Sequence, residues 1–344
     1  RLRWVMVAIT QLVFYGLPWL AWNGRQAVLF DLGARKFYLF GVVLWPQDFI
    51  YLTGLLVMCA LALFLFTAVA GRLWCGYACP QTVYTEIFLW IERRLEGDRN
   101  ARMKLDQGPW SIQKLLRKGS KHLAWGAVAL LTGFTFVGYF EPIRALPAEI
   151  LTLSVSGWTL FWMLFYSVAT WGNAGFMREQ VCKYMCPYAR FQSAMFDRDT
   201  LTVTYDQGRG EPRGSRPRAA DPAQLSLGSC VDCTLCVQVC PTGIDIRQGL
   251  QYECIGCAAC VDVCDDVMDR MNYPRGLIRY TTERAVNQPS TRPTARHHTG
   301  SEVWSHLIRP RTLIYATILL SVFSLWVAAL TVRNPLRVDV IRDR

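Results

Sequence analysis

CVDCTLCVQVCP at Cys230–Pro241 and CIGCAACVDVC at Cys254–Cys264 are the two stretches that decide how this sequence folds. Both have the cysteine spacing C-x2-C-x2-C-x3-C. Three closely spaced thiolates can each hold one iron of a cubane cluster, and the fourth cysteine of each run then ligates the other cluster. The spacing therefore predicts one [4Fe–4S] cluster bound by Cys230, Cys233, Cys236 and Cys264, and a second bound by Cys254, Cys257, Cys260 and Cys240.

This doubled spacing is the arrangement of two-cluster bacterial ferredoxins. One residue departs from the pattern, because Asp265 follows Cys264, whereas a proline follows Cys240 in the first run. Pairs of the form C-x2-C also build zinc sites, but two four-membered runs without a neighbouring histidine disfavour zinc. We therefore expect an α+β dicluster ferredoxin module at residues 228–285, with linkers at 208–227 and 286–312. Such a module relays electrons and needs a donor and an acceptor.

The rest of the chain has the composition of a membrane protein. Of its 344 residues 52% are hydrophobic and only 18% are charged, whereas soluble domains average about 25% charged residues. A spanning helix needs about 20 mostly apolar residues. Five stretches qualify, namely Trp4–Trp22, Phe49–Ala70, Leu123–Phe140, Ile150–Trp171 and Leu313–Val332. The sequence thus predicts a mainly α, polytopic membrane protein with about five transmembrane helices and the ferredoxin module inserted between the fourth and the fifth.

Basic residues predict the orientation of these spans, because cytoplasmic loops are enriched in Lys and Arg. Residues 74–119 hold eight of them and 172–311 hold seventeen, whereas 23–47 hold three and the loop after the third span holds only Arg144. We therefore expect the N-terminus and the ferredoxin module in the cytoplasm, and a periplasmic C-terminal stub at 333–344. The net charge of +11 is then mainly a topology signal, and no nucleic-acid partner is expected.

Two further cysteine pairs share the form C-x-Y-x-C-P. They are Cys75 and Cys79, followed by Pro80, and Cys182 and Cys186, followed by Pro187. Cysteines at i and i+4 share one face of a helix, and each pair follows an inward-running span. Residues 1–207 therefore read as a membrane domain of two related helical hairpins, each ending in C-x3-C-P at the cytoplasmic face. Four converging thiols could bind copper or another metal, hold a further Fe–S centre, act as redox dithiols, or simply pack.

Several weaker features of the sequence lead to further predictions. Nearby cations should lower the pKa of the paired thiols; they are Arg72, Lys183 and Arg190. Cys59, in the middle of the second span, is expected to pack, and Phe37–Trp45 is expected to be an interfacial or re-entrant piece. Glu86–Arg94 reads as an amphipathic helix lying on membrane lipid. The four histidines give no pair suited to haem, and no nucleotide-binding motif is present.

Together with the two cysteine runs, three segments carry a family likeness: WCGYACPQTV at 74–83, EGDRNAR at 96–102 and NAGFMREQVCKYMCPYARFQ at 173–192. They closely resemble the cytochrome c oxidase accessory protein family, also called CcoG, FixG or RdxA. The resemblance implies a bacterial inner-membrane Fe–S protein that supports assembly of cbb3-type cytochrome oxidase by reducing Cu(II) to Cu(I) for copper chaperones. It also gives functional weight to both C-x3-C-P pairs. Family members usually continue into a periplasmic immunoglobulin-like domain, which is absent or cut off after Arg344.

Two other functions stay open at this point. One is a quinol-oxidising membrane electron conduit of the NapH or NosR type, which would need a quinone pocket among the spans. The other is a non-catalytic assembly scaffold or copper carrier, whose clusters only stabilise a docking module. The cupric reductase fits the chemistry best, because Cu(I) prefers soft thiolate ligands and thiols lie next to a one-electron relay. The electron donor and the oligomeric state are left open by the sequence.

Overall fold

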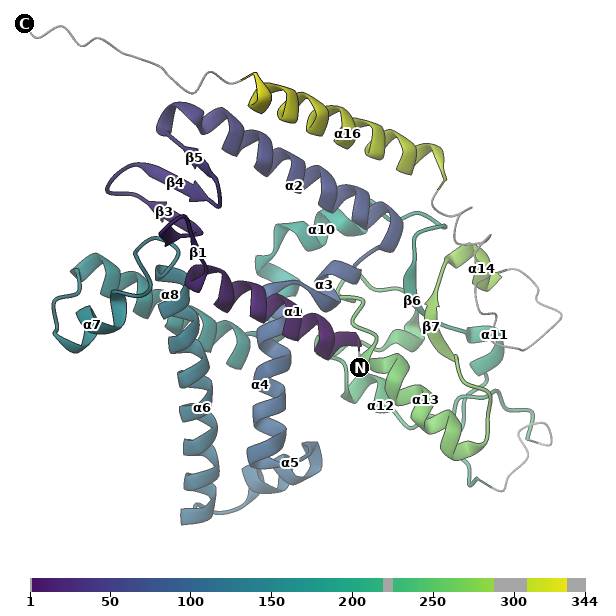
Figure 1. The fold of residues 1–344 in the computed structure, drawn as a ribbon. Helices are drawn as coiled ribbons and strands as arrows, with labels where there is room; N and C mark the ends of the chain where they lie inside the picture. Colours follow the sequence, from purple (N-terminus) through teal and green to yellow (C-terminus); the bar gives the residue numbers. More distant parts are fainter. Residues whose placement is uncertain (1, 219–224, 288–307, 333–344) are drawn as a thin grey trace, which may run out of the picture.

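The computed structural model describes residues 2–218, 225–287 and 308–332, which are mainly helical (Figure 1). The longer helices are α1 (Leu2–Gly16), α2 (Phe49–Ala70), α4 (Pro80–Glu96), α5 (Arg99–Gln107), α6 (Ile112–Val137), α8 (Gly157–Gly175), α13 (Ala259–Met271) and α16 (Pro310–Thr331). Shorter helical segments connect them: η1 (Leu17–Trp19), η2 (Pro46–Asp48), α3 (Leu73–Tyr77), α7 (Leu146–Leu151), α9 (Arg178–Gln180), η3 (Val181–Met185), α10 (Pro187–Ala194), α11 (Gln207–Gly210), α12 (Leu235–Gln238), η4 (Ile246–Gln248) and α14 (Glu283–Asn287). The predicted stub at 333–344 and most of the predicted linker at 286–312 lie outside the described residues.

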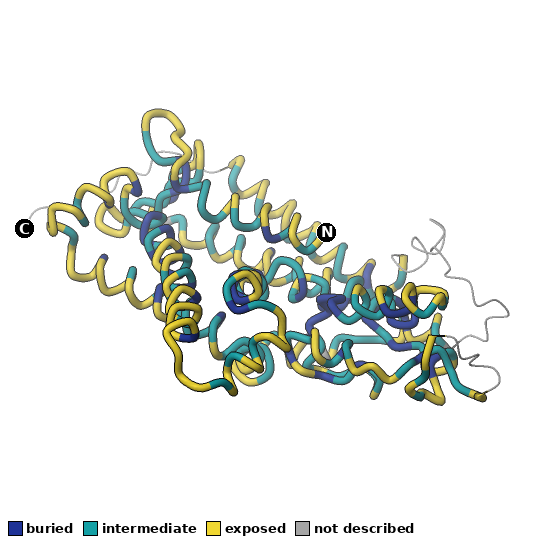
Figure 2. Tube along the Cα trace, turned by 90° about the horizontal axis from the view of Figure 1, so that it is seen from below, coloured by how far each residue is buried: buried dark blue, intermediate teal, exposed yellow. Residues whose placement is uncertain are grey.

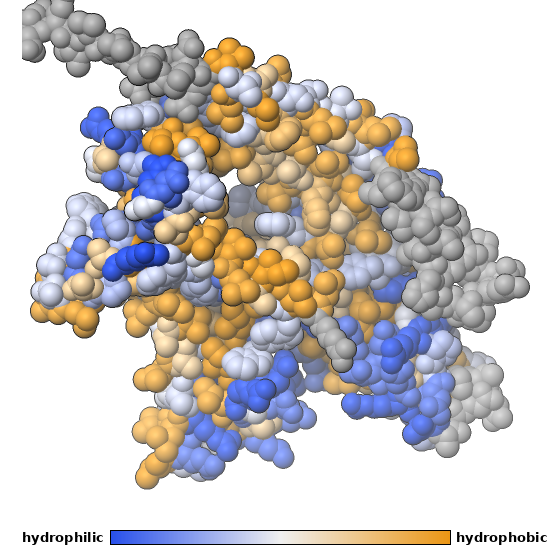
Figure 3. All heavy atoms as spheres, in the orientation of Figure 1, coloured by the Kyte–Doolittle hydropathy of each residue, from blue (hydrophilic) through white to orange (hydrophobic). Residues whose placement is uncertain are grey.

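Two helices, α2 and α16, are long and apolar enough to cross a membrane among the described residues. Their bounds agree closely with the second and fifth predicted spans. They lie side by side, and Figure 3 shows hydrophobic atoms over this face of the molecule. Gly54 allows the close approach, because a Cβ there would lie 2.6 Å from Trp326 Cδ1. The Trp326 indole donates a hydrogen bond of 2.9 Å to the Tyr51 carbonyl, which closes the contact.

The other three predicted spans differ from the observed helices, so the five-span topology is not confirmed. The first helix ends at Gly16, and Pro18 follows in η1, since proline cannot donate the next helical hydrogen bond. The third predicted span is the second half of α6, which begins at Ile112. The fourth is broken between α7 and α8, where Leu153 has a positive φ of 56°.

Helices α4, α6 and α8 pack against one another, and Figure 1 shows α4 and α6 extending below α1. Trp125 of α6 stacks on Phe88 of α4 and donates to its carbonyl at 3.1 Å. Gly133 lets α6 approach α8, because a Cβ there would lie 2.3 Å from the Met163 carbonyl oxygen. The segment Glu86–Arg94 is helical, as expected, and its contact with lipid stays a prediction for its exposed face. This segment belongs to α4, and one of its faces is buried against α6.

Two small antiparallel sheets follow α1. They contain β1 (Ala21–Trp22) with β2 (Arg25–Gln26), and β3 (Val28–Asp31), β4 (Lys36–Leu39) and β5 (Val42–Leu44) in that order. The segment Phe37–Trp45, expected to be interfacial or re-entrant, thus forms most of a hairpin. Its aromatic residues and its two valines are residue types that favour strands.

The cysteine runs lie in a separate module, which Figure 2 shows with a buried core at the end away from the C-terminus. Strand β6 (Thr202–Tyr205) pairs antiparallel with β7 (Ile278–Thr281), and Tyr205 lies opposite Ile278. Both residues are buried in one core with Met268 of α13. Because β6 belongs to this sheet, the module begins before the predicted boundary at 207, inside the region we had assigned to the membrane domain.

Candidate electron-transfer site

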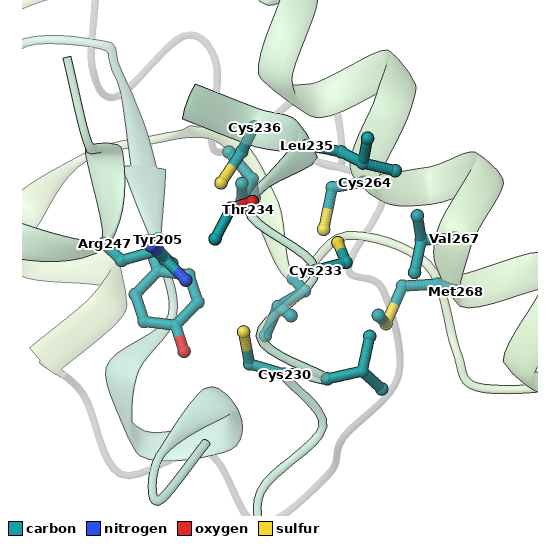
Figure 4. Close-up of a pocket in the computed structure, with 13 residues that line it drawn as sticks. Tyr205, Cys230, Cys233, Thr234, Leu235, Cys236, Arg247, Cys264, Val267 and Met268 are labelled. Atoms are coloured by element: carbon teal, nitrogen blue, oxygen red, sulfur yellow. The ribbon is translucent and has the colours of Figure 1, made fainter. Parts of the chain in front are cut away.

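Four cysteines surround one small cavity in the module. They are the set that the spacing assigned to the first cluster: Cys230, Cys233, Cys236 and Cys264. Figure 4 shows their sulfurs around a common space, with Cys264 on α13, Cys236 on α12 and the other two on the preceding loop. Apolar side chains such as Val267 and Met268 form much of the remaining wall. Cys233 is exposed, so this cavity lies near the surface of the module.

A second small cavity lies beside the first. It is lined by the cysteines assigned to the second cluster, namely Cys240, Cys254, Cys257 and Cys260. Cys236 lines both cavities, so the two share a wall. A one-electron carrier in one cavity would therefore be a direct neighbour of a carrier in the other.

The two loops that wrap the cavities have the same backbone geometry. In the first, Asp232 and Thr234 flank Cys233 with φ values of 52° and 57°. In the second, Gly256 and Ala258 flank Cys257 with φ values of 67° and 57°. Left-handed conformations cost about 1–2 kcal/mol for residues other than glycine and cluster at functional sites. A helix begins directly after each loop, so the two runs are structural repeats.

The residues around both cavities fit iron–sulfur clusters. The first cavity is lined by four thiols and the second by five, counting the shared Cys236, and the remaining lining of both is mainly apolar and includes no carboxylate. Burial raises the pKa of Cys257 and of Cys264 to about 12, with repulsion from neighbouring cysteines adding to the shift. Buried thiols that raise one another's pKa are suited to a cationic iron core, which replaces their protons. Residues of the two four-membered sets would hold the clusters, which supply one-electron storage when bound.

The two C-x3-C-P motifs also have matching geometry. The amide of Cys79 donates to the Trp74 carbonyl at 3.0 Å, and the amide of Cys186 donates to the Val181 carbonyl at 2.8 Å. Each of these is a wide turn of five residues, and in the second motif it forms the π-helical segment η3. The second cysteine of each pair is extended and precedes a proline that begins the next helix. The pairs thus span a break between helices, rather than one continuous helical turn as we expected.

The structure brings the four paired cysteines together, and we call Cys75, Cys79, Cys182 and Cys186 the thiol quartet. Each member acts electrostatically on at least two others. Cys75 and Cys182 also pack against Ile255, Cys257 and Ala259 of the second cysteine run. A Cβ on Gly76 would lie 2.7 Å from the Gly256 carbonyl oxygen and 2.8 Å from Cys257 Cα. The quartet is therefore in direct contact with the loop of the second cavity.

Burial dominates the chemistry of the quartet. It raises the pKa of Cys75 to about 12 and that of Cys182 to about 11, and it also raises the pKa of Cys79. Arg72 lowers the pKa of Cys75 and Cys182, but less than burial raises it. The expectation that nearby cations would favour thiolates is wrong for these three thiols. Lys183 contributes little because Glu179 binds it at 2.8 Å.

A polar network missed by the sequence analysis supports Cys75. Its thiol donates to Gln192 Oε1 at 3.2 Å, and the Gln192 amide donates to Thr67 Oγ1 at 3.3 Å. Tyr188 bonds the same hydroxyl at 2.7 Å. Gln192 and Thr67 are both 0% exposed. A polar Gln six residues after Cys186 was the only signal in the sequence.

Buried ion pairs fix the elements that carry the second motif. Glu92 of α4 is 7% exposed and binds Arg178 of α9 at 3.1 Å, as well as Arg102. Lys121 of α6 binds Glu96 at 2.9 Å. Removing one partner of a buried pair costs about 3–5 kcal/mol. This network therefore holds α9, directly before Cys182, against the helical bundle.

No three His, Cys, Asp or Glu side chains in the described parts of the chain are grouped closely enough to hold a single metal ion. A cubane cluster separates its four thiolates by more than a single ion does, so the two cavities are compatible with this result. Cys59 is exposed on α2 and is not part of any of these groups.

These features define a membrane-associated iron–sulfur protein of the dicluster ferredoxin class. Residues 177–283 match the family model described as a 4Fe-4S dicluster domain, and residues 52–97 match one described as a 4Fe-4S binding domain. The second match contains Cys75 and Cys79 but none of the eight cysteines around the cavities. Iron–sulfur binding is thus supported by the comparison as well as by the geometry.

The chain belongs to the FixG/RdxA family, to which the CcoG proteins also belong. It is 42% identical to the nitrogen fixation protein FixG of Rhizobium meliloti, across 100% of this chain and 70% of FixG. It is 43% identical to protein RdxA of Cereibacter sphaeroides, across 96% of this chain and 69% of RdxA. The methylamine utilization ferredoxin-type protein MauN of Methylobacillus flagellatus is 24% identical across half of this chain. No solved structure matches the chain.

Proposed function

We propose that this chain is a membrane-bound electron-transfer protein that delivers electrons from its ferredoxin module to the thiol quartet, where Cu(II) is reduced to Cu(I). One observation carries the proposal. Cys75 and Cys182 pack directly on the loop of Cys257, so the quartet is the neighbour of the second cavity. The exposed Cys233 marks the opposite end of the relay, where an external donor can approach.

The chemistry of the quartet supports copper as a passing substrate. Each turnover adds one electron to Cu²⁺ to give Cu⁺, and the soft thiolates that bind Cu⁺ must first lose their protons. We infer that the product is then passed on to an acceptor with soft ligands of its own. Met185, 59% exposed beside Cys186, offers a thioether to the incoming ion.

We further propose that the product serves assembly of a cbb3-type oxidase through a copper chaperone. The chain would lie in a bacterial inner membrane as a multi-pass protein, with the module in the cytoplasm and the end of α16 in the periplasm. Alkaline phosphatase fused after Val332 should then be active, whereas a fusion after Thr281 should be inactive. The reverse pattern would refute this orientation.

The reaction itself is tested with purified, anaerobically reduced protein. Cu(II) is added with a Cu(I)-specific chelator, and the yield of Cu(I) is compared with the electrons stored in the protein. We expect about one Cu(I) per stored electron in the wild type and in Cys59→Ser, which changes a cysteine outside the relay. Cys257→Ser should lose most of the yield. Equal yields from Cys257→Ser and the wild type would sink the proposal.

A further inference from the structure

Arg72 lies between the second cavity and the thiol quartet. Its guanidinium donates to the carbonyls of Tyr252 and Cys254 on one side, the latter at 3.1 Å, and to the carbonyl of Ala189 on the other. The residue is 5% exposed, and its Nε has no hydrogen-bond partner. A Cβ on Gly256 would lie 3.2 Å from the Arg72 carbonyl, so the backbone of Arg72 is also in contact with this loop.

This buried cation has no carboxylate partner among the residues that the structure describes. The groups that act on its charge are sulfurs: Cys75, Cys254, Cys182 and Cys186. An isolated buried charge is costly unless an opposite charge compensates it. A thiolate-ligated iron–sulfur cluster carries negative charge, and it gains one more when it is reduced. The second cavity and the quartet are therefore the places from which compensation can come.

The first cavity has a different charge environment. Its wall includes Arg247, which binds Asp245 at 2.8 Å and also Asp232. These two carboxylates more than neutralise the guanidinium. Near the second cavity the other cation, Arg3, is likewise paired, with Asp262 at 2.7 Å. Beside the first cavity, Arg216 donates to the Cys230 carbonyl at 3.5 Å without a carboxylate partner among the described residues, but it is only partly buried. Within the described chain, Arg72 is thus distinguished by being a buried cation that has no carboxylate partner and contacts the loop of the second cavity.

We propose that Arg72 is the counter-charge of the second iron–sulfur cluster and makes that cluster easier to reduce than its burial alone would allow. Burial opposes the added negative charge of reduction, because a charge is poorly solvated away from water. A fixed cation at the loop of Cys254 offsets this cost. Arginine is suited to the task because its guanidinium stays protonated even when buried.

Arg72 then favours electron flow toward the membrane. One electron leaves the first cluster and enters the second, no bond is made or broken, and no proton moves. The inference rests on the iron–sulfur part of the proposed function but not on copper as the acceptor. It is measured without copper, so a failure of Cu(II) reduction and a failure of this inference are separate results.

The test is a redox titration followed by EPR on the full, cluster-loaded protein. In Arg72→Gln we expect the midpoint potential of the second cluster to fall by at least 59 mV. For a one-electron carrier, this fall changes the electron distribution between the two clusters at least tenfold. The first cluster should be unchanged. The affected signal is assigned by its loss or alteration in Cys257→Ser. Arg275→Gln, which removes an exposed cation paired with Asp269 from the same module, should alter neither midpoint.

Arg72→Lys separates charge from loop geometry, because it keeps the charge but cannot repeat the three carbonyl contacts. In Arg72→Lys we expect the midpoint potential of the second cluster to stay close to the wild-type value. The electron distribution between the two clusters should then change less than threefold. A fall as large as in Arg72→Gln would overturn the inference, and so would unchanged midpoints in Arg72→Gln or equal shifts of both clusters. If Arg72→Gln loses the second cluster, the inference is tested with Arg72→Lys alone. A change in the electron distribution below threefold supports the inference, and a change of tenfold or more overturns it.

Discussion

In the metal-free protein, three thiols of the quartet keep their protons to a higher pH than an ordinary thiol does. Cys75, Cys79 and Cys182 are partly buried between helix ends and the second cysteine run, and burial raises the pKa of each thiol. A soft metal ion must displace these protons to bind. Binding at the quartet should therefore strengthen as the pH rises, by up to tenfold per unit for each thiolate formed.

The same shifts predict how the quartet reacts with an alkylating agent. In metal-free protein, the rates for Cys75 and Cys182 should rise about tenfold per pH unit and continue to rise above pH 9, because only the thiolate reacts. An ordinary thiol levels off near its pKa, which is 9.0. Peptide mass spectrometry after timed iodoacetamide treatment measures each cysteine separately. A plateau below pH 10 would contradict the raised pKa values.

The raised pKa of Cys75 also gives the direction in which pH changes the stability of the folded protein. The folded state holds the Cys75 proton up to about pH 12, whereas the ordinary value is 9.0. Between these values the folded state binds more protons than the unfolded state, so this contribution to stability is present below pH 9 and is lost as the pH rises toward 12. The sequence could not give this result. It shows Arg72 three residues before Cys75, but the burial that outweighs the cation is a property of the fold.

At the scale of elements, the contact between α3 and the second cysteine run joins the membrane part to the module. It is made at Gly76 and Gly256, where backbone meets backbone. Glycine is required at both positions for different reasons. Gly76 leaves no room for a Cβ, and Gly256 has both a close neighbour and a positive φ of 67°. Overpacking such a contact costs about 1–3 kcal/mol.

Gly76→Ala should therefore separate the quartet from the module. A Cβ at this position meets the Gly256 carbonyl and Cys257 Cα, and neither is the flexible end of a side chain. We expect a lower thermal midpoint in detergent and a loss of iron from the second site. Gly172→Ala is the matched control, since its Cβ meets nothing within 4 Å. Equal midpoints and iron contents in the two variants would disprove the contact.

Local patterns in the sequence predicted those features of the fold that depend only on residues close together in the chain. The apolar runs located α2 and α16, and the cysteine spacing grouped the residues that line each cavity. Patterns could not predict long-range pairing. Strand β6 joins the module only because Thr202–Tyr205 pairs with a strand more than seventy residues later. Glu92 lies in a segment that was predicted to be a helix on the membrane surface, yet its side chain is buried, where Arg178 and Arg102 pair with it.

At the scale of the whole molecule, three groups of four cysteines form a line of neighbours. The first cavity shares Cys236 with the second, and the loop of Cys257 carries the quartet on its other side. The surface follows the same division. Figure 3 shows hydrophobic atoms over the long helices and hydrophilic atoms over the module. Electrons accepted at the hydrophilic end would thus leave beside the helices that belong in the membrane.

The most direct test of this path is the rate at which Cu(II) oxidises the reduced protein. In an anaerobic stopped-flow experiment, the absorbance of the iron–sulfur clusters is followed after Cu(II) is added to wild type and to Cys75→Ser with Cys182→Ser. Iron content is measured first, so that only cluster-loaded proteins are compared. We predict that the double variant keeps its clusters but is oxidised at least tenfold more slowly. Equal rates would contradict an exit through the thiol quartet.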